Sequence, residues 1–379
     1  MKRVVVVGAG TGGAMVANRL ARQLSTEITN QDVEVLIISD SESHIYQPGL
    51  LYVALSLADP QSVFRKQKLV LLPSVQLVQD AAVKIDMHQR RVFLDSGNDV
   101  EFDYLVLATG SHPDFNAIPG FREGAHSFYT FDEAMRTRRD LENFKQGKLL
   151  MIIGVPHKCP VAPLEFMFMY DKLLRQRQGR DKIELVYTYP LGRLHSLEPV
   201  AEWAEVAFEE SGIVGETFFN PEEIDTQARI VSTLEGEEVS YDFLVAIPPH
   251  KGARVIRASK LGDSDGWLPT NRWTLELEGH EGAYVIGDAA NLPISKAGSV
   301  AHYESEVVVQ NIIRQLHGEA PLPLYDGKVY CFIEGGLHKA THITFDYTTP
   351  PRPSEPTEMV HWFKMAFNRM YWLSVRGLV

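Results

Sequence analysis

The sequence predicts an α/β protein with two Rossmann-like halves and a separate C-terminal segment. The first observation is a uniformly apolar stretch, Lys2–Val7, that runs directly into closely spaced glycines and a helical pattern. The second is a similar strand, turn and helix that starts at Leu149. The third is a late apolar stretch, Ala283–Ala289, that contains Gly-Asp and leads into another helix. Uniformly apolar strands that alternate with helices are typical of parallel sheets covered on both faces.

Composition excludes several classes of protein. A chain of 379 residues has room for two or three domains. Lysine and arginine number 37 against 49 acids, so the net charge is −12 and nucleic acid is not expected as a partner. The two cysteines exclude a disulfide-stapled fold and a cysteine-rich metal site, and we expect no metal.

The N-terminal residues have the composition of a signal peptide, but their glycine spacing identifies the first strand and turn of a domain. We therefore expect no signal peptide and a protein made in the cytoplasm. No uninterrupted run of 18 apolar residues is present, so we expect no transmembrane helix.

The first half has the fingerprint of a dinucleotide-binding turn. Its glycines fit G-x-G-x-x-G between the first strand and a helix over Ala14–Gln23, and a second strand follows at Val33–Ile38. The residue that holds a ribose should end that second strand, and either of two neighbouring residues fits. The glycines are Gly8, Gly10 and Gly13, and the ribose candidates are Ser39 and Asp40.

The chain then completes this half. A loop-and-helix excursion over His44–Pro73 is expected to cover the cofactor. A buried strand over Asp103–Gly110 ends in Ala-Thr-Gly, and a later helix is expected over Gly298–Leu316. Short antiparallel strands are expected at Val75–Asp80, Ala82–Asp86 and Arg91–Leu94.

The second half lacks the usual turn. The G-x-G-x-x-G register would fall on Gly154, Pro156 and Cys159, and proline offers no N–H to a phosphate. The next strand, Ile183–Thr188, also ends without an acid for a ribose. This turn therefore presents a thiol where a nicotinamide dinucleotide would be held.

These patterns divide the chain into four stretches. We expect residues 1–112 to form the first part of one dinucleotide-binding domain and residues 113–250 to form the second Rossmann-like domain with Cys159. Residues 251–320 return to the first domain, and residues 321–379 form a C-terminal segment that carries Cys331.

The glycine fingerprint, the Ala-Thr-Gly turn and the Gly-Asp motif, in this order, resemble the flavoproteins with two dinucleotide-binding domains of the disulfide-reductase type. The resemblance implies FAD, with the aspartate on the ribityl chain and the next helix pointing at the isoalloxazine. The residues that carry it are Ala108, Thr109, Gly110, Gly287 and Asp288, with Lys296 and Gly298 near the start of the helix.

Within this superfamily, G-x-P-x-K-C-P-x-A-P-x-E over 154–165 resembles sulfide:quinone oxidoreductase and the flavin subunit of flavocytochrome c sulfide dehydrogenase. Pro248-Pro249 and Cys331-Phe332 extend the resemblance over most of the chain. It implies that Cys159 and Cys331 are a redox pair facing the flavin. Many members have a third cysteine, which would fall within 126–130, on Tyr129, and is absent here.

A sulfur bridge between the two cysteines would be an electrophile for sulfide. Attack would leave a persulfide on one cysteine and a thiolate on the other. Lys158 beside Cys159 is a candidate for lowering the thiol pKa, although it also fits a solvated turn residue. Glu165 is the favoured proton acceptor because it matches the family motif, and His157 and His195 are alternatives.

The C-terminal stretch Thr357–Leu373 places Trp, Met and Phe on one broad helical face, with basic residues off it. Composition alone favours a core or dimer helix over a helix in the membrane interface. The resemblance favours the membrane, implies that residues 1–112 and 251–320 form the FAD-binding domain and residues 321–379 a quinone and membrane-interface segment, and implies that Phe332 lines a quinone pocket. The apolar face consists of Met359, Trp362, Phe363, Ala366, Phe367, Met370 and Leu373, and the residues off it are His361, Lys364, Asn368 and Arg369.

We therefore expect a peripheral enzyme of the cytoplasmic membrane that oxidises sulfide to polysulfide or sulfur, with FAD as cofactor and quinone as acceptor. Alternatives are a sulfide dehydrogenase subunit that passes electrons to cytochrome c and an NADH:quinone dehydrogenase. A flavin-binding interaction protein without turnover is the non-enzymatic alternative, and self-association to a homo-oligomer stays open.

Overall fold

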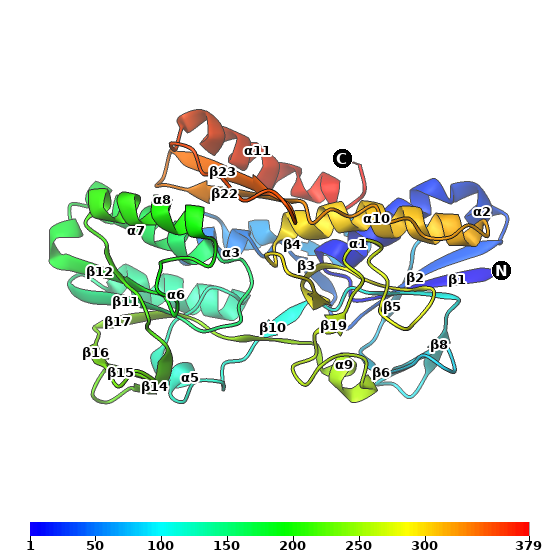
Figure 1. Cartoon of the computed structure of the whole chain (residues 1–379), viewed down its shortest axis with the longest axis horizontal. Helices are drawn as coiled ribbons and strands as arrows, with labels where there is room; N and C mark the ends of the chain where they lie inside the picture. Colours follow the sequence, from blue (N-terminus) through cyan, green and yellow to red (C-terminus); the bar gives the residue numbers. More distant parts are fainter. Residues whose placement is uncertain (379) are drawn as a thin grey trace.

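In the computed structural model, which describes residues 1–378, the first half is built on a parallel sheet of order β20-β9-β1-β2-β5. Helices α1 (Thr11–Gln23) and α10 (Gly298–Leu316) lie side by side over one face (Figure 1). A second apolar cluster fills the other face beneath the short strands within residues 82–101 and helix α9 (Arg254–Ser259). The strands are β1 (Lys2–Val7), β2 (Val33–Ser39), β5 (Gln76–Gln79), β9 (Tyr104–Leu107) and β20 (Ala283–Val285).

One strand of this half was predicted wrongly. The expected antiparallel strand Val75–Asp80 is β5, which pairs in parallel with β2 at the edge of the main sheet. The antiparallel strands are β6 (Ala82–Asp86), β7 (Arg91–Leu94) and β8 (Asp99–Glu101). The pattern of a short strand does not show whether it pairs in parallel or antiparallel, because the partner, here β2, lies far away in the chain.

The second half has its own parallel sheet, of order β13-β12-β11-β17. Its strands are β11 (Gly147–Ile153), β12 (Ile183–Thr188), β13 (Val214–Glu216) and β17 (Phe243–Ile247). Helices α6 (Phe131–Asn143), α7 (Ala162–Gln176) and α8 (Glu198–Ser211) accompany it, and a small sheet of β14 (Pro221–Asp225), β15 (Ile230–Thr233) and β16 (Glu238–Ser240) adds to it.

The two halves are joined by two crossing segments that pair with each other. Strand β10 (Ser111–Pro113) runs antiparallel to β18 (His250–Gly252), so the chain leaves and returns along one ladder (Figure 1). The four-stretch boundaries themselves stay a prediction.

The C-terminal segment lies across both halves. Hairpin β22 (Val329–Glu334) and β23 (Ala340–Phe345) contacts α7 of the second half and α10 of the first, and α11 (Glu358–Ser374) packs on the hairpin (Figure 1). Among residues 1–378, no helix combines the length and apolar character needed to cross a bilayer.

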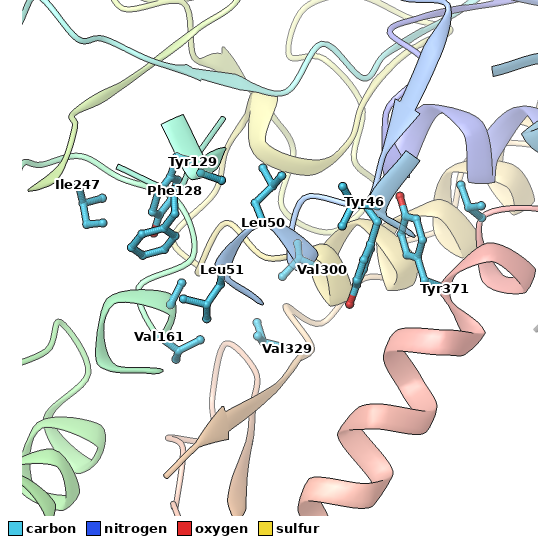
Figure 2. Packing of buried hydrophobic residues seen from close by; sticks show 14 of the residues in the cluster. Tyr46, Leu50, Leu51, Phe128, Tyr129, Val161, Ile247, Val300, Val329 and Tyr371 are labelled. Carbon is cyan, nitrogen blue, oxygen red and sulfur yellow. The ribbon is translucent and has the colours of Figure 1, made fainter. Parts of the chain in front are cut away.

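Shorter elements complete the chain. They are α2 (Ser25–Thr29), β3 (Ser43–Ile45), α3 (Gly49–Ala54), η1 (Pro60–Val63), β4 (Phe64–Lys66), α4 (Gln67–Val70), α5 (Phe121–Gly124), η2 (Arg180–Lys182), β19 (Leu268–Pro269), η3 (Gly287–Ala289) and β21 (Ala290–Asn291). Helix α3 lies within the excursion that was expected to cover the cofactor. It contributes Leu51 to the buried cluster that also holds Val161 and Val329 (Figure 2).

Candidate active site

The first glycine turn has the shape of a phosphate cradle. A Cβ on Gly8 would lie 2.4 Å from the Ala108 carbonyl oxygen, and one on Gly13 would lie 1.9 Å from the Gly8 carbonyl oxygen. At Gly10, by contrast, a Cβ would point into open space, with no neighbouring atom within 4 Å. Helix α1 starts there without a side-chain cap and without an acid in its first turn. Its free N–H groups and its positive dipole end therefore suit a pyrophosphate.

The opposite wall also fits a flavin nucleotide. The hydroxyl of Thr109 is buried without a hydrogen-bond partner, and Gly110 faces open space at φ +64°. Lys296 Nζ donates to the carbonyls of Asp288 and Ala290 at 2.8 Å each. Helix α10 begins at Gly298 without a side-chain cap or an acid in its first turn. A negative charge on a reduced isoalloxazine would be stabilised at this helix start.

The ribose candidates differ in environment. Ser39 ends β2 and is buried, and its hydroxyl is held by backbone groups of Ser41 at 3.2 Å. Asp40 follows it and is exposed. The free carboxylate of Asp40 is therefore better placed to accept ribose hydroxyls, and this assignment stays a prediction.

The two cysteines meet at the start of α10. The Cys159 amide donates to the Lys296 carbonyl at 2.9 Å, and the amide of Tyr330, the residue before Cys331, donates to the Ser299 hydroxyl at 3.3 Å. The pKa of Cys331 is raised to about 12, first by burial and then by the negative charge of Cys159. The structure thus brings together two thiols from opposite ends of the sequence, beside the helix that should face the flavin.

Tyr129 occupies the place where the family's third cysteine was expected. Its ring is buried beside Phe128 (Figure 2). Its hydroxyl donates to the carbonyls of Lys158 and Cys159 at 3.0 and 3.2 Å. Cys159 has φ +51°, a left-handed conformation that is uncommon for a residue with a side chain. Tyr129 therefore holds the backbone that presents the thiol.

Other groups dominate the electrostatics of the Cys159 thiol, and the expected effect of Lys158 on it stays a prediction. Burial and the charge of Glu165 raise the pKa of Cys159 to about 12, and the main cation that opposes this is Lys364. The Lys158 amino group points instead to the side-chain oxygen of Gln47 at 2.6 Å and to the Asp288 carboxylate at 3.9 Å. Lys158 thus faces the cofactor side, and any catalytic role for it stays a prediction.

Glu165 lies in a buried charged cluster that the sequence did not reveal. It accepts a hydrogen bond from the Glu334 amide at 2.8 Å and forms an ion pair with Lys364. Glu334 in turn contacts His361 Nδ1 at 3.1 Å. The sequence pattern places Lys364 and His361 off the apolar face of the C-terminal helix. Their alignment one turn apart was the available signal that they share a second, inward face.

The alternative proton acceptors, His157 and His195, are both neutral and bonded to backbone groups. Burial lowers the pKa of His157 to about 4 and that of His195 to about 3. Nδ1 of His157 lies 3.2 Å from the Lys158 carbonyl, and Nδ1 of His195 accepts from the Leu197 amide at 3.0 Å. Both rings are therefore neutral near pH 7, and their roles stay predictions.

Helix α11 buries polar side chains and exposes apolar ones, which is the reverse of an ordinary surface helix. His361, Lys364 and Tyr371 are buried, whereas the predicted apolar face is exposed. Trp362 and Met359 are each 64 % exposed and Phe363 is 59 % exposed. Such a face is unusual in contact with water.

An aromatic group lies between this helix and Cys331. The ring of Phe332 packs 5.8 Å from that of Phe367 on α11, and Tyr330 meets Phe332 edge-on at 5.0 Å. Residues 330, 332 and 334 share one face of β22, so this apolar pair adjoins the buried charges at Glu334 and Lys364.

The second turn does not form a phosphate cradle. A Cβ on Gly154 would lie 2.5 Å from Pro249, so proline packs where a ligand would approach. Helix α7 begins only at Ala162 and carries Pro163 and the buried Glu165 in its first turn. A missing N–H and an acid both disfavour an anion at this helix start.

Comparisons with known proteins agree with this geometry. A family model described as pyridine nucleotide-disulphide oxidoreductase matches residues 2–311. The mitochondrial sulfide:quinone oxidoreductase of Mus musculus is 27 % identical over 99 % of this chain and 86 % of its own length. The NADH dehydrogenase-like protein YutJ of Bacillus subtilis is 24 % identical over 84 % of this chain and 85 % of its own length.

Among solved structures, the fold resembles the sulfide:quinone oxidoreductase of Aquifex aeolicus. The TM-score is 0.87 at 22 % identity, and the match covers 100 % of this chain and 92 % of that one.

Proposed function

Because the chain belongs to the pyridine nucleotide-disulphide oxidoreductase family, we propose that it is an FAD-dependent sulfide:quinone oxidoreductase. Members of this family are flavoproteins, so the expectation of FAD is confirmed. The observation that carries the proposal is the meeting of Cys159 and Cys331 at the start of α10. Relatives named for sulfide oxidation over nearly the whole chain support the same substrate.

The cysteines supply the sulfur chemistry. In the oxidised enzyme a sulfur bridge joins Cys159 and Cys331, and HS⁻ attacks one of its sulfurs. The bridge breaks, the attacked cysteine becomes a persulfide, and the electron pair of the broken bond stays on the other as a thiolate. The bound FAD supplies a two-electron acceptor beside this pair. Glu165, buried and paired with Lys364, is placed to hold a proton near the sulfurs.

Quinone is the proposed acceptor, bound between β22 and α11. Phe332 and Phe367 provide apolar rings for its head group, and the adjoining Lys364 provides a buried N–H donor for a carbonyl oxygen. The exposed face of α11 would rest in the membrane interface, where Trp and Phe are favoured and where the quinone is dissolved. This makes the protein peripheral, with the side of the membrane left as a prediction.

NADH is disfavoured as the electron donor, although a relative is named NADH dehydrogenase-like. Pro249 fills the approach to Gly154, and the first turn of α7 repels an anion through Glu165. Cys159 and Cys331 would also have no task in hydride transfer from NADH. A cytochrome c acceptor and a role without turnover have no specific observation in their favour.

An anaerobic assay that follows quinone reduction tests the proposal. We expect the purified FAD-loaded protein to reduce a short-chain ubiquinone with sulfide and to be at least about a hundredfold slower with NADH. Activity with NADH and none with sulfide would overturn the proposal.

The membrane part has its own test. Sedimentation with liposomes should fall when Trp362 and Phe363 are both replaced by serine. The exposed pair Val206 and Leu234 on the second half, changed in the same way, provides the control and should leave binding unchanged. Equal binding of both double variants would refute a docking role for α11.

A further inference from the structure

We propose that Glu334 and His361 form a proton relay that delivers protons from the protein surface at His338 to the buried Lys364–Glu165 pair during quinone reduction. This inference rests on the proposed function and assigns a task to residues that the sulfur chemistry leaves unused. They are relay residues, because they act through Lys364 and Glu165 rather than by touching the sulfur.

The buried groups form a continuous line. His361 Nδ1 lies 3.1 Å from each carboxylate oxygen of Glu334. Glu334 Oε1 lies 3.9 Å from Lys364 Nζ and accepts from the Tyr52 hydroxyl at 3.2 Å. Lys364 then forms its ion pair with Glu165. Glu334 is fully buried, and Lys364 and His361 are 7 % and 8 % exposed.

The line reaches the surface at one end. The ring of His361 meets the ring of His338 edge-on at 6.0 Å, and His338 is exposed on the turn between β22 and β23. At the other end, Glu334 and Phe332 lie on the same face of β22, beside the aromatic pair proposed for quinone. Water and quinone are thus at opposite ends of one set of titratable groups.

Proton balance supplies the reason for such a line. Sulfide loses two electrons in becoming zero-valent sulfur, and quinone takes up two electrons and two protons to become quinol. HS⁻ carries a single proton, so at least one must come from water. The exposed apolar face of α11 would be in contact with lipid in the proposed complex, which closes the direct aqueous path.

Stability alone is a poor explanation for this cluster. Taking each charged group out of water is unfavourable, and well-packed apolar side chains of similar size are often at least as stabilising as a buried ion pair. Histidine and carboxylate side chains, by contrast, are the usual groups that pass protons.

His361 is faced by Glu334 on β22 and by His338 on the hairpin turn, and its own helix carries Lys364. Glu334 and Lys364 in turn contact Tyr52 on α3 and Glu165 on α7. The pH response of the relay depends on all of these groups. Removing His361 should therefore change the shape of the pH profile of quinone reduction, and a change that only loosened the fold would lower the rate evenly across pH.

The test separates the two half-reactions by rapid mixing under anaerobic conditions. In His361→Gln and Glu334→Gln, flavin reduction by sulfide should stay within about twofold of wild type. Flavin reoxidation by a short-chain ubiquinone should slow by on the order of a hundredfold. Ser374→Ala, a buried polar change on the same helix, is the control and should leave both rates unchanged.

Two further measurements separate loss of the relay from a folding defect in these variants. Added imidazole should restore reoxidation in His361→Ala, since a small base can replace the missing ring. Without turnover, the NMR chemical shifts of the His361 ring at fixed pH in the oxidised protein should change in Glu334→Gln, because the variant alters the group that contacts Nδ1.

The outcomes distinguish failure of the relay from failure of the proposed function on which it rests. A wild-type flavin that sulfide does not reduce would overturn the proposed function. Normal reduction by sulfide, together with reoxidation at the wild-type rate and pH profile in both glutamine variants, would overturn the relay alone.

Discussion

Lys364→Met tests the buried charges most sharply, because it removes the cation that pairs with Glu165 and leaves the hydrophobic volume nearly unchanged. Breaking a buried ion pair by deleting one partner costs about 3–5 kcal/mol, because the other charge is left uncompensated. We therefore expect the free energy of unfolding to fall by about this amount. The double variant Lys364→Met, Glu165→Leu should recover most of the loss, since no uncompensated charge remains at that pair.

The change in the free energy of unfolding of Lys364→Met with pH has a definite sign. Burial raises the pKa of Glu165, and Lys364 opposes that rise. Without Lys364 the pKa should rise further, so the folded state binds more protons than the unfolded state above pH 5. Stability of the single variant should then fall, as the pH rises above the usual pKa of a glutamate, more steeply than that of wild type.

Urea unfolding followed by tryptophan fluorescence measures both effects, with Arg369→Met, an exposed change on the same helix, as the control. The control should stay within about 0.5 kcal/mol of wild type. A loss below about 1 kcal/mol for Lys364→Met, with no added pH dependence, would refute the reasoning.

The other predictions concern the cysteines, the backbone clamp and the cofactor turn. Cys159→Ser and Cys331→Ser should each lower flavin reduction by sulfide at least about a hundredfold, and full activity in either would refute the redox pair. With the pKa of both thiols at about 12, alkylation of the reduced protein by iodoacetamide should be slow at neutral pH and accelerate with rising pH, and rapid labelling at pH 7 would contradict this. Tyr129→Phe keeps the ring but loses the hydrogen bonds to the 158 and 159 carbonyls. The alkylation rate of Cys159 should therefore change, whereas that of Cys331 should stay the same. Gly13→Ala should lose FAD, seen as a lower flavin-to-protein absorbance ratio, whereas Gly179→Ala, in open space, should keep it.

The first sheet and the cofactor turn could be predicted well from sequence, because their signals are local. Apolar runs, glycine spacing and helix starts lie within short windows, and α10 and β12 have the predicted bounds. The pairing of β5 was missed because it depends on a strand far away in the chain.

The site was predicted only in part, for the same physical reason. Resemblance brought together Cys159 and Cys331, but composition could not show which cation faces them. Lys158 is adjacent in sequence and turns toward Asp288, whereas Lys364, from the last helix, lies next to Glu165. Orientation of a side chain follows from tertiary packing, which sequence spacing does not fix.

The central claim is that the sulfurs at 159 and 331 act as one redox unit, and peptide mass spectrometry of the enzyme as purified in air tests it most directly. After blocking of free thiols and digestion without reductant, we expect peptides containing Cys159 and Cys331 joined through a disulfide or a sulfur-bridged link, and separated after anaerobic sulfide treatment. Recovery of both cysteines as separate, alkylated peptides before any sulfide is added would contradict the account.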